Sequence, residues 1–361
     1  MTEPAPAAAG STAAAGRPPR SAAGPAAGPG RWPQSPVLVR VPATSANLGP
    51  GFDSFGLALA RYDLVEVEVR PAGLVIEVTG YGEDLAADGE QHLVVRTLRA
   101  GLAAAGAGQP PGLAVRCRND IPQGYGLGSS AAAVIAGLLA ARALAAAALA
   151  PDGIVPDGPG PGWPAGQSVV AGQNVVAGDE MLRLAAGIEG HADNVAACLR
   201  GGLTIAWTGP AGPRSARLRP AAGLAPVICL PSEPMATAAA RMVLPQAVPH
   251  ADAAANSARA ALLAASLTGQ QPPDVLLAAT EDFLHQPYRA AAMPGSADLI
   301  GRLRSAGIPA VISGAGPSVL ALLPGPRDPG EVAAIAAARP GGWQVWPTAV
   351  DLDGATVLPA R

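Results

Sequence analysis

The segment Pro122-Gln-Gly-Tyr-Gly-Leu-Gly-Ser-Ser-Ala-Ala132 places three glycines at alternate positions, directly before two serines and an alanine-rich run. Glycine adopts positive φ angles without steric penalty and lets the backbone approach a ligand closely. The serines predict the start of a helix over residues 129–149, where free backbone N–H groups, hydroxyls and the positive end of the helix dipole converge. The segment therefore predicts an anion site, for which phosphate is the natural occupant.

Two better-known phosphate loops are excluded by the residues of this segment. A P-loop needs lysine after its last glycine, but Ser129 stands there. A dinucleotide-binding fingerprint has the spacing G-x-G-x-x-G, whereas this segment has G-x-G-x-G. A purely structural glycine-rich turn with a serine cap stays open as an alternative, although plain caps rarely need three glycines.

Strand and helix patterns alternate on both sides of this loop. Val65, Val67 and Val69 interleave with glutamates, which predicts a strand with one solvated face. Pro71-Ala72-Gly73 predicts a turn into a second strand at 74–79, and we expect the two strands to form a hairpin. Similar patterns predict helices at 91–106, 191–200 and 329–339 and strands at 113–119, 203–208, 309–313, 318–323 and 343–350.

These patterns describe an α+β protein of two domains, as the length of 361 residues also favours. We expect an N-terminal domain over 35–208 and a C-terminal domain over 209–361. Residues 1–34 consist largely of alanine, proline and glycine, which predicts a disordered tail. The low-complexity stretch 150–178 predicts a surface insertion within the first domain.

The composition of the chain limits the classes of partner that we expect and indicates its cellular compartment. The net charge is −3, and the 24 lysines and arginines are spread thinly, so neither a nucleic-acid surface nor such a partner is expected. We expect no membrane-spanning segment, because the most apolar run, 131–149, is mostly alanine. The isolated cysteines Cys117, Cys198 and Cys229 fit buried thiols in a reducing cytosol and share no spacing typical of a zinc site.

Two further glycine-rich elements carry polar side chains. Residues 41–56 follow the first strand and contain Asn47 and Asp53, an amide and a carboxylate that such a loop can present to a small polar ligand. A tight turn with self-capping by these side chains is the structural alternative. Near the C-terminus, residues 312–318 join two apolar strands, and their glycines predict close backbone packing.

The three elements, in this order, resemble the signature motifs of the galactokinase, homoserine kinase, mevalonate kinase and phosphomevalonate kinase family, the GHMP kinases. The variants at 45–53, 189–194, 237–245 and 285–289 resemble those of its homoserine kinase branch. The resemblance covers about residues 36–350 without the insertion. It implies a GHMP kinase fold, with an N-terminal nucleotide-binding domain, a C-terminal ferredoxin-like domain and the site between them. The implied reaction is transfer of phosphate from ATP to the side-chain hydroxyl of L-homoserine, which gives O-phospho-L-homoserine on the route to threonine.

The resemblance also implies roles for individual residues. Arg241 and Arg289 would bind the homoserine carboxylate in two-pronged geometry, and Asp53 would bind its ammonium. Homodimers are common in the family, which adds a homodimer to the expected partners. ATP phosphates would be bound by Pro122, Gln123, Gly124, Tyr125, Gly126, Leu127, Gly128, Ser129, Ser130, Ala131 and Ala132, Mg²⁺ by Ser130 and Glu189, and homoserine by Asn47, Asp53, His191, Asn194, Arg241 and Arg289.

The catalytic residues implied are Asn194, Asp193 and Ser130. Relatives use an aspartate near the acceptor hydroxyl where this chain has Asn194, and an amide cannot act as a base. We therefore expect alignment and charge neutralisation, rather than proton removal by a strong base, to carry the reaction. Asp193 or Asp53 as general base stays open, as do another GHMP kinase substrate and a non-catalytic sensor of the same fold.

Overall fold

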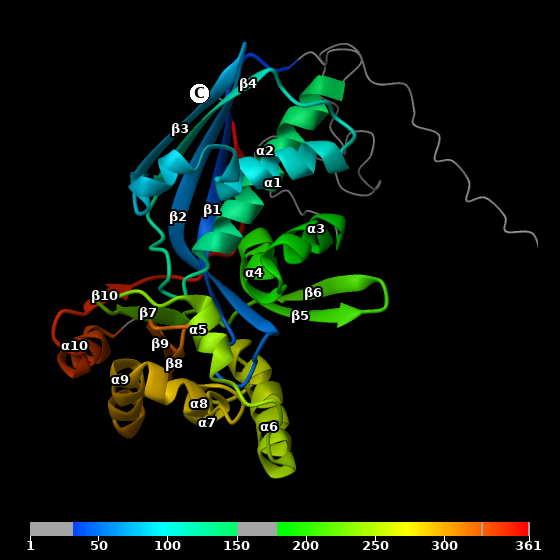
Figure 1. Cartoon of the computed structure of the whole chain (residues 1–361). Helices are drawn as coiled ribbons and strands as arrows, with labels where there is room; N and C mark the ends of the chain where they lie inside the picture. The colour runs from blue at the N-terminus through cyan, green and yellow to red at the C-terminus, as the bar shows by residue number, and fades with distance from the viewer. Residues whose placement is uncertain (1–31, 150–178, 326–327, 360–361) are drawn as a thin grey trace, which may run out of the picture.

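The computed structural model describes residues 32–149, 179–325 and 328–359 of the chain. Within these residues two β-sheets, each covered by helices, form an upper and a lower unit (Figure 1). The insertion expected at 150–178 and most of the expected tail lie outside the described residues. Trp32, at the end of that tail, already packs against the hydrophobic core.

The first sheet has seven strands, with the order β11-β1-β2-β4-β3, and β5 joins it through β2 and carries β6 at its edge. Along β2, Val65 and Val67 are buried while Glu66 and Glu68 are half-exposed, so the predicted strand alternation is confirmed. The strands are β1 (Val37–Ala46), β2 (Phe55–Arg70), β3 (Gly73–Gly80), β4 (Gly112–Asn119), β5 (Leu203–Gly209), β6 (Gly212–Leu218) and β11 (Thr356–Leu358).

The hairpin expected between β2 and β3 is wrong, because β4 lies between them, antiparallel to β2 and parallel to β3. Residues 113–115 of β4 are all buried, so this strand needs an interior position, whereas β3 is mostly exposed and lies at the edge. Arg116 of β4 contacts Glu66 and Glu68 of β2 at 2.6 and 3.1 Å. On its other side Arg116 contacts Glu77 of β3 at 3.3 Å, so charge pairing fits the same strand order.

Helices α1 (Leu93–Ala104) and α2 (Ser129–Leu149) pack together beside the first sheet. They cross closely, because a Cβ added at Gly137 of α2 would collide with Thr97 of α1. The expectation of no segment apolar enough to cross a membrane is wrong for α2, whose mean hydropathy reaches 2.1. Its most apolar stretch is 61% buried, as in a core helix, so small side chains and tight packing account for that hydropathy.

The second sheet is fully antiparallel with the order β10-β7-β9-β8, which is the ferredoxin-like arrangement. The expected fold class is thereby confirmed. Its strands are β7 (Ala225–Leu230), β8 (Ala310–Ile312), β9 (Val319–Leu323) and β10 (Gln344–Pro347). The remaining helices are η1 (Glu83–Gln91), α3 (Asp179–Glu189), α4 (Asp193–Arg200), α5 (Thr237–Met242), α6 (His250–Leu267), α7 (Val275–Ala279), α8 (Gln286–Arg289), η2 (Ala290–Ala292), α9 (Pro294–Ser305) and α10 (Pro329–Ala338).

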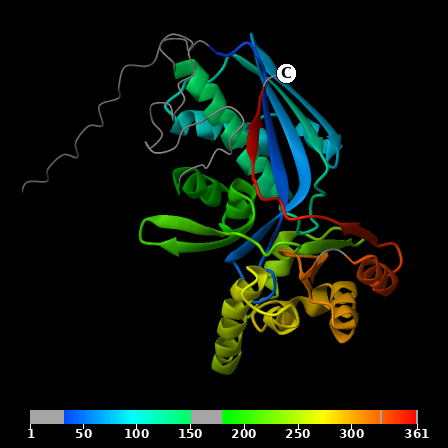
Figure 2. The ribbon, with the colours of Figure 1, turned by 180° about the vertical axis from the view of Figure 1, so that it is seen from behind.

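The chain crosses between the two units twice. The expected division between residues 208 and 209 falls inside the β5–β6 hairpin, which belongs to the first sheet. After β10 the C-terminal segment returns to the first unit, where β11 pairs with β1 (Figure 2). Asp351 N donates to Ala58 O and Gly202 N donates to Asp351 O, which attaches this segment to the first unit. We propose units over 35–218 plus 349–359 and over 219–348.

Candidate active site

A cleft of about 570 Å³ lies where the start of α2, the 47–54 loop, α4, α5 and the 313–316 loop meet. Of the expected site residues, it brings together Asn47, Asp53, Pro122, Gln123, Gly124, Gly126, Leu127, Gly128, Ser129, Ser130, Ala132, Glu189, His191, Asp193, Asn194, Arg241 and Arg289. Two expected residues do not line it. The Tyr125 hydroxyl donates to Ser232 O, and Ala131 is buried inside α2.

The glycines of the phosphate loop have the positive φ angles that the sequence predicted, 77° at Gly124, 73° at Gly126 and 71° at Gly128. A Cβ added at Gly126 would collide with the carbonyl oxygen of Ser313, and one at Gly128 with the Thr44 hydroxyl. Two of the three glycines are therefore required by the packing of the empty protein, before any ligand is bound. The loop ends at Ser129, where α2 begins and its first N–H groups face the cleft.

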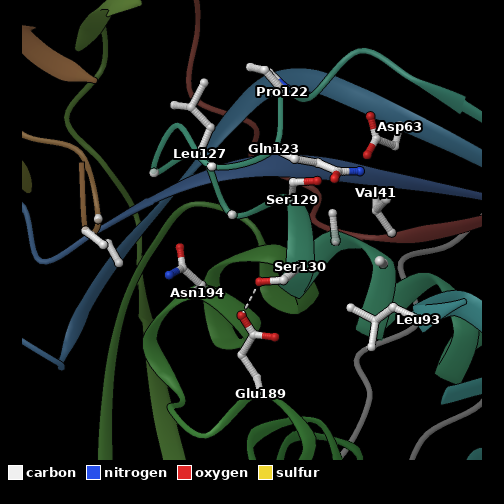
Figure 3. A pocket seen from close by; sticks show the side chains of 18 of the residues that line it. Val41, Asp63, Leu93, Pro122, Gln123, Leu127, Ser129, Ser130, Glu189 and Asn194 are labelled. Carbon is white, nitrogen blue, oxygen red and sulfur yellow. Dashed lines mark hydrogen bonds between the residues drawn. The ribbon is translucent and has the colours of Figure 1, made fainter. Parts of the chain in front are cut away.

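Ser130 and Glu189 form a pair of oxygen donors beside this anion site. Ser130 Oγ donates a hydrogen bond to Glu189 Oε1, and Asn194 lies next to them (Figure 3). Burial raises the pKa of Glu189. A hydroxyl and a carboxylate next to a phosphate site form a donor set that Mg²⁺ accepts. Within the described residues no group of three or more His, Cys, Asp and Glu side chains could hold a metal.

The start of α4 arranges three polar side chains. His191 Nδ1 lies 3.0 Å from Asp193 Oδ1, and this hydrogen bond raises the pKa of His191. The same Asp193 oxygen accepts from Asn194 N at 2.7 Å, and Asp193 is buried. Thr44 Oγ1 of β1 donates to Asn194 Oδ1 at 2.7 Å. This hydrogen bond orients the Asn194 amide and leaves its Nδ2 donor for a ligand.

The loop after β1 joins the two units. Asn47 has a φ of 69°, donates from Nδ2 to Gly314 O at 2.7 Å and accepts at Oδ1 from Asp53 N at 2.9 Å. The Asp53 carboxylate then pairs with Arg241 of α5, with Nη2–Oδ1 at 2.9 Å. The amide, the carboxylate and the guanidinium that the sequence placed in separate motifs therefore meet in one cleft.

Arg289 of α8 is only 1% exposed and is held by the protein itself. Its Nε donates to Ala240 O at 3.1 Å, and its Nη1 donates to His285 Nδ1 at 3.0 Å and to Gly314 O at 3.2 Å. His285 thus accepts at Nδ1 and lies 2.9 Å from Gly49 O through Nε2, an arrangement that needs a neutral ring. Burial lowers the pKa of His285, in agreement with that tautomer. Arg289 lines the cleft, and no hydrogen bond or ion pair of its Nη2 with a described residue is present.

Sequence reasoning missed the end of the cleft between the first sheet and α1. Apolar side chains line it, together with polar groups that include Asp63, His92 and Asn119. The signal was weak, because Asp63 is one acid in a strand and His92 one residue at a predicted helix start. Thr44, which donates to Asn194, was missed because 150 residues separate the two. The first strand, β1, also extends to Ala46, so Thr44 lies within it and not in the loop expected from residue 41.

Comparison with known proteins supplies the family. Models of the GHMP kinase N-terminal and C-terminal domains match residues 92–156 and 261–340. The homoserine kinase of Streptomyces coelicolor is 47% identical over 323 residues, 90% of this chain and 94% of that protein. The homoserine kinase of Leifsonia xyli subsp. xyli is 45% identical over 328 residues, 89% of this chain and 91% of that protein.

Solved structures agree with this assignment. Homoserine kinase from Cytophaga hutchinsonii superposes with a TM-score of 0.71 at 25% identity, covering 90% of this chain and 98% of that one. A Leishmania mevalonate kinase (L. major), at 14% identity and a TM-score of 0.56 over 91% and 98% of the chains, shares the fold. The chain therefore belongs to the GHMP kinase family and, within it, to the homoserine kinases.

Proposed function

We propose that this protein transfers the γ-phosphoryl group of ATP to the side-chain hydroxyl of L-homoserine. The observation that carries the proposal is the meeting of Asp53 and Arg241 in the cleft that also contains the phosphate loop. A zwitterionic amino acid needs a carboxylate at one end and a guanidinium at the other. Both line the same cleft as an anion site at a helix N-terminus.

ATP would bind with its phosphates at the start of α2 and its base in the apolar end of the cleft. The backbone N–H groups after Gly128 and the hydroxyls of Ser129 and Ser130 face the phosphates there. Ser130 and Glu189 are the residues that would hold Mg²⁺. When bound, the ion neutralises charge on the phosphate oxygens.

Homoserine would bind at the other end of the cleft. Its ammonium contacts Asp53, and its carboxylate contacts Arg241 together with the free Nη2 of Arg289. Arg289 is well suited to this role because three contacts to the protein already fix its guanidinium. Asn47, His191 and Asn194 complete the lining.

The substrate hydroxyl oxygen forms a bond to the γ-phosphorus as the bond to the ADP oxygen breaks. Asn194 orients that hydroxyl through Nδ2, because the hydrogen bond from Thr44 to its Oδ1 fixes the direction of the amide. Asp193 stays an alternative base, because its Oδ1 contacts His191 and Asn194 while no hydrogen bond of its Oδ2 with a described residue is present. The proton leaves to phosphate or water, with Asp53 as the other alternative base.

We further propose a cytosolic location and a homodimeric assembly. The described cysteines Cys117, Cys198 and Cys229 are buried and unpaired, which fits a reducing compartment. Light scattering on the purified full chain measures the assembly directly.

The test of the activity is a coupled ADP-release assay with Mg-ATP over L-homoserine, L-serine, L-threonine and mevalonate. We expect turnover with L-homoserine well above the other three, and a phosphate ester on its side-chain oxygen by ³¹P NMR. Preference for mevalonate, or ADP release that is independent of the acceptor, would contradict the proposal.

A further inference from the structure

The end of the cleft farthest from Asn194 forms a slot with apolar walls and few polar groups. Val41 of β1 and Leu93 of α1 lie on opposite sides of it, and Asp63 of β2 lies beside Val41 (Figure 3). Val65 and Leu127 also line it. The function proposed above places the base of ATP in this end of the cleft without assigning a role to Asp63. Such a slot suits a flat aromatic base, and the few polar groups decide which base it accepts.

Asp63 is the charged group built most firmly into this slot. It is 5% exposed, and its Oδ1 accepts hydrogen bonds from Asp120 N at 2.8 Å and Ile121 N at 2.9 Å. Burial raises its pKa to about 7, although the two backbone hydrogen bonds act in the opposite direction. No described residue donates a hydrogen bond to its Oδ2. One oxygen therefore fixes the carboxyl group, and the other is left for a ligand.

His92, at the start of α1, supports a polar recognition site in the same slot. His92 is only 4% exposed, and its Nδ1 has no hydrogen-bond partner among the described residues. Burial lowers the pKa of His92, so the ring is neutral and offers one donor and one acceptor. A buried, unpartnered ring nitrogen that lines a cavity costs free energy unless a ligand contacts it.

The purine bases differ at the position that such groups read. Adenine carries an amino group there, a hydrogen-bond donor, whereas guanine and hypoxanthine carry a carbonyl oxygen, an acceptor. A carboxylate oxygen only accepts, and Asp63 is in this ionised form at a pH above its raised pKa of about 7, where the affinities are to be compared. We propose that Asp63 determines the base specificity of the enzyme, with Oδ2 accepting a hydrogen bond from the 6-amino group of adenine. This inference rests on the proposed use of ATP and extends it to the choice of base.

The Asp63→Asn substitution tests this role with little change of shape. The asparagine Oδ1 can keep both backbone hydrogen bonds, so the 120–121 loop stays in place, while Nδ2 replaces the free acceptor by a donor. Calorimetry with ADP and IDP compares the two bases, because both nucleotides carry the same phosphates. We expect the wild-type protein to bind ADP at least about tenfold more tightly than IDP, and the variant to lose most of that ratio.

The matched control is Asp88→Asn, another carboxylate that lines the cleft, which should leave the ratio unchanged. Equal loss of ADP and IDP affinity in Asp63→Asn would mean that Asp63 only fixes the 120–121 loop and does not distinguish the bases, which would overturn the proposal. If that variant does not fold, calorimetry on the wild-type protein with purine riboside diphosphate still tests the proposal, because this nucleotide lacks the 6-amino group of ADP. Binding of that nucleotide as tight as that of ADP overturns the proposal. Homoserine is absent from these measurements, so their outcome is independent of the acceptor substrate.

Discussion

Asp53 and Arg241 form a two-pronged ion pair across the cleft, with Nη2–Oδ1 at 2.9 Å and Nη1–Oδ2 at 3.3 Å, although 188 residues separate them. We assign Asp53 to the ammonium of homoserine and Arg241 to its carboxylate. In the empty protein the two side chains bind each other instead. Substrate binding must then exchange one ion pair for two. Both side chains are about 40% exposed, which keeps the cost of separating them low.

Replacing Arg241 by alanine should weaken homoserine but not ATP, since the phosphate loop belongs to the other unit. Loss of a hydrogen bond to a charged group costs about 1.5–3 kcal/mol, or roughly ten- to hundredfold in kcat/KM. Steady-state kinetics with both substrates measures this. Arg302→Ala, a half-exposed arginine of α9 paired with Asp298, is the control and should behave as wild type. A normal homoserine KM in Arg241→Ala would mean that the carboxylate is held elsewhere.

Arg289 should respond differently from Arg241, because it is buried and supports the fold as well as the substrate. Lysine offers one compact ammonium in place of the fork that reaches Ala240 O, His285 Nδ1 and Gly314 O. Arg289→Lys should therefore lower both kcat/KM for homoserine and the free energy of unfolding, the latter by about 1–3 kcal/mol. Urea denaturation followed by circular dichroism gives the second quantity. Unchanged stability would show that these buried contacts do not form.

A methyl group at Gly126 should destabilise the empty protein. Its φ of 73° costs an alanine about 1–2 kcal/mol, and the added Cβ would also collide with Ser313 O of the other unit. Gly301→Ala is the control, because this glycine of α9 has open space around it and a helical position. It should stabilise by about 0.5–1 kcal/mol. Equal unfolding free energies for the two variants, measured in urea without nucleotide, would contradict the packing role of Gly126.

The Mg²⁺ requirement should change when Glu189 loses its charge. In Glu189→Gln the amide oxygen can still accept from Ser130, so the fold is kept while the anionic ligand is lost. We expect the Mg²⁺ concentration for half-maximal rate to rise by roughly tenfold or more, a range in which metal sites respond even to loss of outer-shell partners. Glu180→Gln, on the same helix and paired with Arg183, is the control. Normal Mg²⁺ dependence in Glu189→Gln would assign the ion to another carboxylate.

The titration of His191 should depend on Asp193. Their hydrogen bond favours the protonated ring, so the pKa of His191 lies above its ordinary value and the positive charge is lost only as pH rises past that raised pKa. Asp193→Asn should lower the midpoint, which NMR of the imidazole protons measures. Asp298→Asn, a remote carboxylate, should leave it unchanged. An unaltered midpoint in Asp193→Asn would show that the two side chains do not interact in solution.

Contiguous patterns were enough to identify the phosphate loop, the long helix after it, the alternation in β2 and the homoserine-kinase-like motifs. These features depend on residues within a few positions of one another, where φ preferences, helix capping and side-chain periodicity act. The positive φ angles at Gly124, Gly126 and Gly128 are of this kind. So is the start of α2 at Ser129.

Other features depended on which distant segments pack together, and local patterns carry no information about that. The turn after β2 predicted a hairpin, yet β4 took the interior position, because burying its apolar residues 113–115 outweighs the short connection. The pairing of Arg241 with Asp53, the burial of Arg289 against Gly314 and the desolvation of Asp63 have the same origin. Each joins residues far apart in the chain. The first contact exists only once the two units have folded against each other, the second only once the second unit has folded, and the third only once the first unit has folded.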